Sequence, residues 1–196
     1  MVDAWLASAG LRPVSRVERD STTAWDLLLD GRRRLGLRIT VILHPGLGLI
    51  VWLPWAPPLQ DNQRRAYQQL LQWNDELPFV KFGLDAGLRP VLSVEIVPEA
   101  AGPRVLGLAI ARVLAVCDHL VAVAPSWLRL PPAPRPASAP ASASPAAGPG
   151  ATPGGVALLE RYAADLAELT GAPATLADDD GATGFGAPGI EGAGGP

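Results

Sequence analysis

The side chains that could do chemistry in this chain are few, and the two closest in sequence are Cys117 and His119. A thiol beside an imidazole could act as a nucleophile with its base. However, residues two apart on a helix do not face each other, and Cys117 lies within an apolar run. The second histidine, His44, precedes Pro45 in an expected turn. We therefore expect no catalytic residue, and we expect Cys117 to be a buried structural thiol.

Motifs for metals and cofactors are equally weak. Two distant histidines and one cysteine make no zinc-ligand spacing. The acidic run at 178–180 lacks the Gly and Glu of a calcium loop. The segment "GFGAPG" at 184–189 matches the form GxGxxG, but no strand precedes it and no helix follows it. The sequence therefore predicts no metal and no cofactor.

Charge divides the chain into two parts. Residues 1–130 carry a net charge of +2 and residues 131–196 a net charge of −5. A nearly neutral first part lacks the basic surface of a nucleic-acid binder, so we expect no nucleic acid as a partner. The only basic cluster is Arg32, Arg33 and Arg34. It suits either a solvated turn or a contact with an anion or partner.

Composition predicts four segments. Residues 1–130 have the size and apolar content of one domain. Residues 131–155 are rich in Pro, Ala and Ser, and we expect a disordered linker there. The stretch "VALLERYAADLAEL" favours an isolated amphipathic helix over 156–170. Residues 171–196 form a Gly/Ala-rich acidic segment, which we expect to be a disordered tail.

The most hydrophobic stretch is "VLGLAIARVLAVCDHLVAVA", which Arg112, Asp118 and His119 interrupt. A membrane span needs about 20 apolar residues with few or no charges, so a buried helix is the better interpretation. The first residues carry no signal-peptide pattern, and a single cysteine gives no sign of an oxidising compartment. We expect a cytoplasmic protein that does not bind a membrane.

Hydrophobic periodicity predicts nine elements in the first domain. Short turns join consecutive strands, which excludes a parallel sheet with crossover helices. We expect an α+β fold, an antiparallel sheet with helices on one face, in the order α-β-β-β-β-α-β-β-α. The expected helices are 2–10, 59–77 and 103–124, and the expected strands are 14–19, 24–29, 35–43, 47–55, 79–84 and 90–97.

Apolar residues also occur on the second face of two of these strands, at Ile42, Ile50 and Trp52. Tryptophan is favoured where one side is apolar and the other is wet, and it anchors interfaces. Trp52 and Trp55 flank Pro54, so core packing and a partner surface are both open for them. Our candidate partner-binding residues are Ile50, Trp52, Trp55 and Trp127.

The stretch "LLQWNDELPFVKFGLDAGLRPVLSVEIVPE" and the element order resemble the YbjN-like family of bacterial proteins over roughly residues 1–125. That resemblance implies a fold similar to type III secretion chaperones, small homodimers that bind extended client segments. Members are often labelled sensory transduction regulators, and the family pattern carries no catalytic residue. The matching residues are Leu71, Asn74, Leu77, Pro78, Lys81, Phe82, Leu84 and Asp85.

Two hypotheses for the function follow. The first is a non-enzymatic interaction module, a homodimer that binds an unknown client protein through apolar sheet or helix surface. The 156–170 helix could then plug the client groove in the same chain. The second is a small-molecule-binding domain or enzyme, with a pocket between sheet and helices and Asp26, Arg38 and His44 at its mouth.

Overall fold

The computed structural model describes residues 1–59, 63–124 and 154–170. Six antiparallel strands form one sheet in the order β1-β2-β3-β4-β6-β5. The strands are β1 (Ser15–Arg19), β2 (Thr22–Leu29), β3 (Leu37–His44), β4 (Gly48–Pro54), β5 (Lys81–Leu84) and β6 (Pro90–Ile96).

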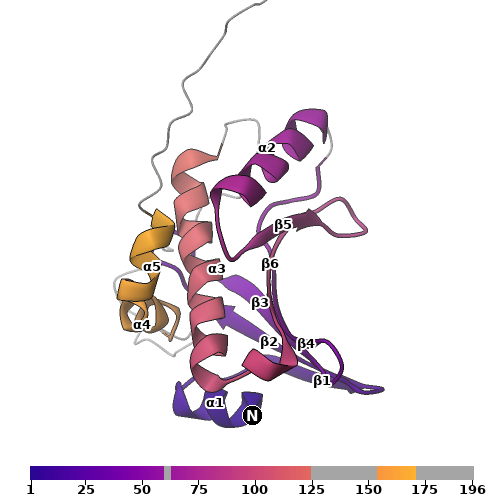
Figure 1. Cartoon of the computed structure of the whole chain (residues 1–196), viewed down its shortest axis with the longest axis vertical. Coiled ribbons are helices and arrows are strands. Elements are labelled where there is room, and N and C mark those ends of the chain that lie inside the picture. The colour runs from indigo at the N-terminus through magenta and orange to yellow at the C-terminus, as the bar shows by residue number, and fades with distance from the viewer. Residues whose placement is uncertain (60–62, 125–153, 171–196) are drawn as a thin grey trace, which may run out of the picture.

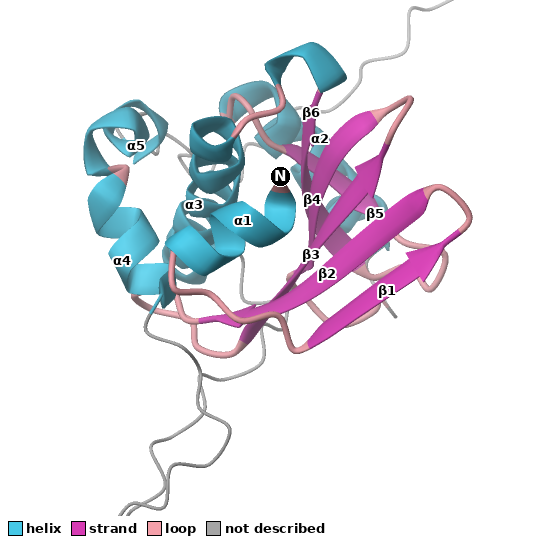
Figure 2. Cartoon of the chain, turned by 90° about the horizontal axis from the view of Figure 1, so that it is seen from below, coloured by secondary structure: helices cyan, strands magenta, loops and turns pink. Residues whose placement is uncertain are grey.

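The helices lie on one side of this sheet in two layers (Figures 1 and 2). The layer next to the sheet holds α1 (Val2–Ser8), α2 (Gln63–Glu76) and the long α3 (Pro103–Val123). A second layer, α4 (Gly154–Arg161) and α5 (Ala163–Thr170), covers α3 on the side away from the sheet. The short helix η1 (Pro98–Ala100) links β6 to α3. The predicted α+β class, element order and placement of the helices on one face are confirmed for the first domain.

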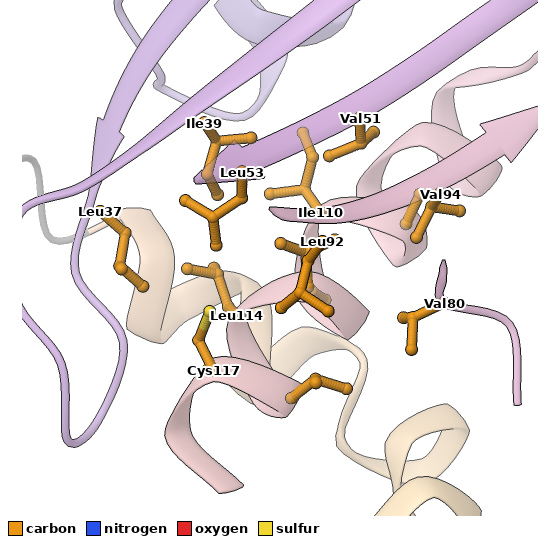
Figure 3. Close-up of a cluster of buried hydrophobic side chains, with 14 of the residues drawn as sticks. Leu37, Ile39, Val51, Leu53, Val80, Leu92, Val94, Ile110, Leu114 and Cys117 are labelled. Carbon is orange, nitrogen blue, oxygen red and sulfur yellow. The ribbon is translucent and has the colours of Figure 1, made fainter. Parts of the chain in front are cut away.

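The main core lies between the sheet and α3. Alternate residues of β3 point inward, and Leu37, Ile39 and Val41 are at most 4% exposed. Leu37 and Ile39 belong to the same buried cluster as Ile110 and Leu114 of α3 (Figure 3). The strands have an apolar face because their branched side chains recur every two residues. The helix has one because such side chains recur every three to four residues. Burial of these faces is what holds the two layers together.

The family-motif residues build the connection between α2 and the edge strand β5. Asn74 accepts a hydrogen bond from the Phe82 amide at 2.6 Å and donates one to the Phe82 carbonyl at 3.0 Å. Lys81 pairs with Glu95 of β6 at 2.8 Å. Asp85 accepts bonds from two amides of the following turn. These motif residues therefore make structural contacts within the fold.

The segment expected as an isolated helix over 156–170 is neither isolated nor a single helix. It forms α4 and α5, separated at Tyr162, and both pack against α3. Its apolar stripe is almost fully buried there, because α3 offers a second apolar face that a single sequence pattern does not locate. The linker prediction overlaps α4 at residues 154 and 155. The rest of the predicted linker and the whole predicted tail lie outside the described residues.

Helix α3 is long and apolar enough to cross a membrane by those criteria alone. In this fold it is mostly buried between the sheet and the α4–α5 pair. Its composition therefore has a structural cause, since a helix covered on two sides needs apolar residues over most of its circumference.

Candidate interaction surfaces

The side of α3 that faces α4–α5 is built from small residues. Gly107, Ala111 and Ala115 follow one another at four-residue spacing, which places them on one face of the helix. A side-chain carbon at Gly107 would collide with the Tyr162 hydroxyl and ring. Ala111 is fully buried. The small residues thus let α4–α5 approach α3 closely.

The α4–α5 pair supplies the large side chains of this second interface. A charged contact lies at its edge, where Arg104 of α3 pairs with Asp165 at 3.1 Å. Gly155 also touches the Asp30 backbone, so a side chain would not fit there. The stripe is 4–6% exposed and consists of Leu158, Leu159, Tyr162, Leu166 and Leu169.

Asp118 of α3 organises the basic turn after β2. Its carboxylate accepts hydrogen bonds from the amides of Arg32, Arg33 and Arg34 at 2.7–3.2 Å. The Asp118 side chain also packs so closely on Gly31 that a side chain there would collide with it. Arg34 turns inward and donates to the Trp55 carbonyl, and burial lowers the pKa of Arg34. The side chains of Arg32 and Arg33 are exposed.

The outer face of the sheet carries a second apolar area. Ile42 and Ile50 are directly opposite each other on β3 and β4, and Trp52 lies next along β4. All three are half-buried although, within the described residues, every helix packs on the other face. This is where the structure places the predicted partner residues Ile50 and Trp52.

A polar cluster borders that apolar area. The Asp26 carboxylate accepts hydrogen bonds from Arg38 at 2.6 Å, Thr40 at 2.7 Å and Ser15 at 2.8 Å. Partial burial acts to raise the pKa of Asp26, but the bonds from Arg38, Thr40 and Ser15 outweigh it and lower the pKa. The carboxylate is therefore already satisfied by protein donors.

The site suggested for a small-molecule pocket is not brought together as expected. Asp26 and Arg38 do meet, but on the outer face of the sheet and not between sheet and helices. His44 lies six residues along β3 from Arg38, about 20 Å away. Its ring accepts a bond from the Gly46 amide in the turn. The alternation of strand residues, which puts 26, 38 and 44 opposite to the core, decides this placement.

Trp55 lies in the core and is 0% exposed, so it cannot line a partner surface in this conformation. Its ring packs edge-on against Trp73 of α2 and Phe82 of β5, at centroid distances of 5.7 and 6.2 Å. Pro54 ends β4, and the next residue turns in beneath α2. The alternative of core packing is thus correct for Trp55. Trp127 lies outside the described residues.

Of the two residues considered for covalent catalysis, Cys117 is placed as a structural group. Cys117 is fully buried, and burial raises the pKa of its thiol to about 12. It packs against the sheet-side residues of the main core (Figure 3). His119 is half-buried on α3, near the turn that holds Arg32 and Arg33. A protonated thiol in an apolar core is a structural group, as the sequence suggested.

Sequence reasoning missed the roles of Asp118 and Gly107. In the sequence Asp118 is only an interruption of an apolar run. A carboxylate in such a run is seldom buried without partners, so it signals a specific partner, although not which one. Gly107 gives a similar signal, because glycine in a helix interior costs about 1 kcal/mol relative to alanine and often has a packing reason.

Fold and surfaces together define an α+β domain whose central helix and sheet each carry an apolar face outside the main core. Residues 1–124 match the YbjN family model, described as a "putative bacterial sensory transduction regulator", and the chain therefore belongs to the YbjN family. The family resemblance seen in the sequence is confirmed. The family description is that of a regulator and not of an enzyme. No curated protein matches the chain. Helices α4 and α5 lie beyond the matched region.

Proposed function

We propose that this protein is a non-enzymatic regulatory interaction module that binds a helical client segment on the small-residue face of α3. One observation carries this proposal: a helical segment from outside the family region, α4–α5, already packs on that face. The face thus accepts an amphipathic helix whose large apolar side chains cover Gly107, Ala111 and Ala115. A helix laid into an apolar groove is a common mode of peptide recognition.

In this chain α4–α5 would act as an occupant that competes with the client. Because residues 124–153 join the segment covalently to α3, its effective concentration at α3 exceeds that of a free segment. A client must therefore bind α3 more tightly than the tethered α4–α5 pair does, or it can bind only after a signal has released the pair. Such competition would make the module regulatory and not constitutively open.

The outer face of the sheet supports a second part of the proposal, a homodimer. Ile42, Ile50 and Trp52 form a half-buried apolar area with the polar Asp26 cluster at its border. An apolar centre with a polar rim is typical of protein interfaces. A second copy of the chain would cover this area. A chaperone-like mode of client binding and a cytoplasmic location remain parts of the same proposal.

The test of the client surface is binding of a labelled peptide of residues 154–170 to the full chain, measured by fluorescence anisotropy. Two aspartates in the buried stripe, Leu159→Asp with Leu166→Asp, should detach α4–α5 and free α3. We expect this variant to bind the peptide and the unaltered chain not to. The matched control places aspartates at the exposed Ala157 and Ala164 and should behave like the unaltered chain. Equal binding to all three proteins, or to none, would contradict the proposal.

The homodimer is tested by light scattering on the full chain. We expect a dimer that Trp52→Glu converts to a monomer, because a buried unpaired carboxylate opposes association. Leu71→Glu, a similar change at an exposed site on α2, should leave the dimer intact. A monomeric unaltered chain would refute this part.

A further inference from the structure

The structure holds a cavity of about 380 Å³ at the seam between α3, the α4–α5 pair and the basic turn. Arg32 and Arg33 come from the turn, and Asp118 and His119 come from α3. The remaining lining is apolar and consists of Ala115, Leu159, Ala163, Leu166 and Ala167. Small-molecule sites have this combination of apolar wall and few polar groups, and this volume falls at the small end of their range.

We propose that this cavity binds a small organic monocarboxylate that carries a short apolar body. Its carboxylate would pair with the guanidinium groups of Arg32 and Arg33, and its body would contact the apolar wall. Arginine presents a planar fork of donors that matches a carboxylate. Among the described residues neither arginine takes part in an ion pair.

The role of Asp118 supports this assignment. Its carboxylate is the acidic group that lines the cavity, and it is engaged by three backbone amides and not by the arginine side chains. Those amide bonds fix the turn and hold Arg32 and Arg33 at the rim. The two arginines and the one aspartate of the lining together leave an excess of one positive charge. This excess suits a monoanion better than a doubly charged phosphate.

The apolar wall determines what the ligand stabilises. Leu159, Ala163 and Leu166 belong to α4–α5, so the cavity exists only while the pair is docked. A ligand that binds only the docked form shifts the equilibrium toward it by mass action. This consequence rests on the proposed function, in which docked α4–α5 compete with the client: the ligand would keep the client surface closed.

The experiment is titration calorimetry of the full chain with octanoate. Acetate supplies the head group without the body, 1-octanol the body without the charge, and inorganic phosphate a different anion. We expect saturable binding of octanoate and much weaker binding of the other three. The variant Arg32→Gln with Arg33→Gln should weaken octanoate binding about tenfold or more, because two charge-assisted contacts are lost. It keeps the backbone amides that bind Asp118.

The matched control removes two exposed arginines on α2, Arg64→Gln with Arg65→Gln, and should leave octanoate binding unchanged. Ala163→Phe should abolish binding without any change of charge, because the ring fills the cavity. Circular dichroism confirms that each variant is folded. No saturable octanoate binding, equal binding of 1-octanol, or full affinity in the double arginine variant would overturn the proposal.

A failure of this proposal is separable from a failure of the proposed function. The peptide assay contains no octanoate, so its result does not depend on whether the cavity binds a carboxylate. If the peptide assay succeeds, octanoate should not bind the Leu159→Asp, Leu166→Asp variant and should leave the binding of the peptide to that variant unchanged. If octanoate binds but the peptide assay fails, the cavity remains a ligand site without a role at α3.

Discussion

The two buried sides of α3 are built differently. Toward the sheet the helix presents large residues, Ile110 and Leu114, which interdigitate with strand side chains (Figure 3). Toward α4–α5 it presents Gly107, Ala111 and Ala115, and the large side chains come from the other helices. The sheet side lies wholly inside the family region, whereas the segment covering the other side lies outside it.

The interface between α3 and the sheet is therefore part of the family fold, whereas the interface between α3 and α4–α5 is an addition to it. Removing the sheet would expose branched side chains contributed by both partners. Toward α4–α5, α3 contributes little side-chain bulk of its own, because Gly107, Ala111 and Ala115 are small. An interface of this second kind can open without unfolding the domain, as a regulatory surface requires.

The largest effect is expected on the sheet side. Leu114→Ala removes a fully buried side chain and leaves a cavity in a close-packed core. The free energy of unfolding should fall by about 2–5 kcal/mol. Urea denaturation followed by circular dichroism measures it. A loss below about 1 kcal/mol would mean that α3 is not anchored mainly through this side.

Asp118→Ala should come next, because it leaves the amides of Arg32, Arg33 and Arg34 without their acceptor. Bonds to a charged group are stronger than neutral ones, and a loss of roughly 2–3 kcal/mol is expected. Asp118→Asn keeps one acceptor oxygen and should lose less. The same denaturation experiment compares the two. If both variants were as stable as the unaltered chain, the turn would be held by other contacts.

Gly107→Ala should loosen the packing of α4–α5 on α3, while the packing of α3 on the sheet stays at least as stable as before. Alanine stabilises a helix interior by about 1 kcal/mol relative to glycine, but here its methyl group collides with Tyr162. Amide hydrogen exchange should therefore accelerate in 154–170 while the sheet stays at least as protected as before. Gly102→Ala, where nothing lies within 4 Å, should not accelerate exchange in 154–170. Unchanged exchange in both variants would show that Tyr162 moves aside at no cost.

The smallest effect is expected far from α3, at Asp26. The folded state lowers the pKa of Asp26 from its ordinary value of 3.8. The contribution of Asp26 to the free energy of unfolding is therefore present above pH 3.8, and it disappears as the pH falls through the lower pKa of the folded state. Asp26→Asn should remove this pH dependence, and the difference at neutral pH should stay below about 1 kcal/mol because Arg38 is exposed. Unfolding free energies measured between pH 2 and pH 7 test this. A larger loss at low pH than at neutral pH would reverse the assignment.

Much of the first domain could be predicted from sequence because its signals are local. Alternation in 35–43 and 47–55 identified two strands and their inward faces, and Pro103 marked the start of α3. Trp55 could not be placed in this way. Its position after Pro54 fits a surface as well as a core, and only the packing of Trp73 and Phe82 decides between them.

The contacts of α3 with the basic turn and with α4–α5 were harder to predict, because they join residues distant in sequence. Asp118 meets Arg32 across 86 residues, and Arg104 meets Asp165 across 61. Periodicity identified the apolar stripe of 156–170 but not the surface it covers. The cavity likewise depends on three segments that carry no common pattern.

The sequence by itself determined the α+β class, the family, the apolar faces of the strands and the amphipathic stripe near residue 160. These follow from local spacing and from short-range backbone preferences. Only the tertiary structure decided that α4 and α5 pack on α3, that Asp118 holds the basic turn, and that Asp26 and Arg38 lie outside the core. Which distant segments pack together depends on the complementarity of their shapes and charges, because burial of apolar surface stabilises only surfaces that fit each other.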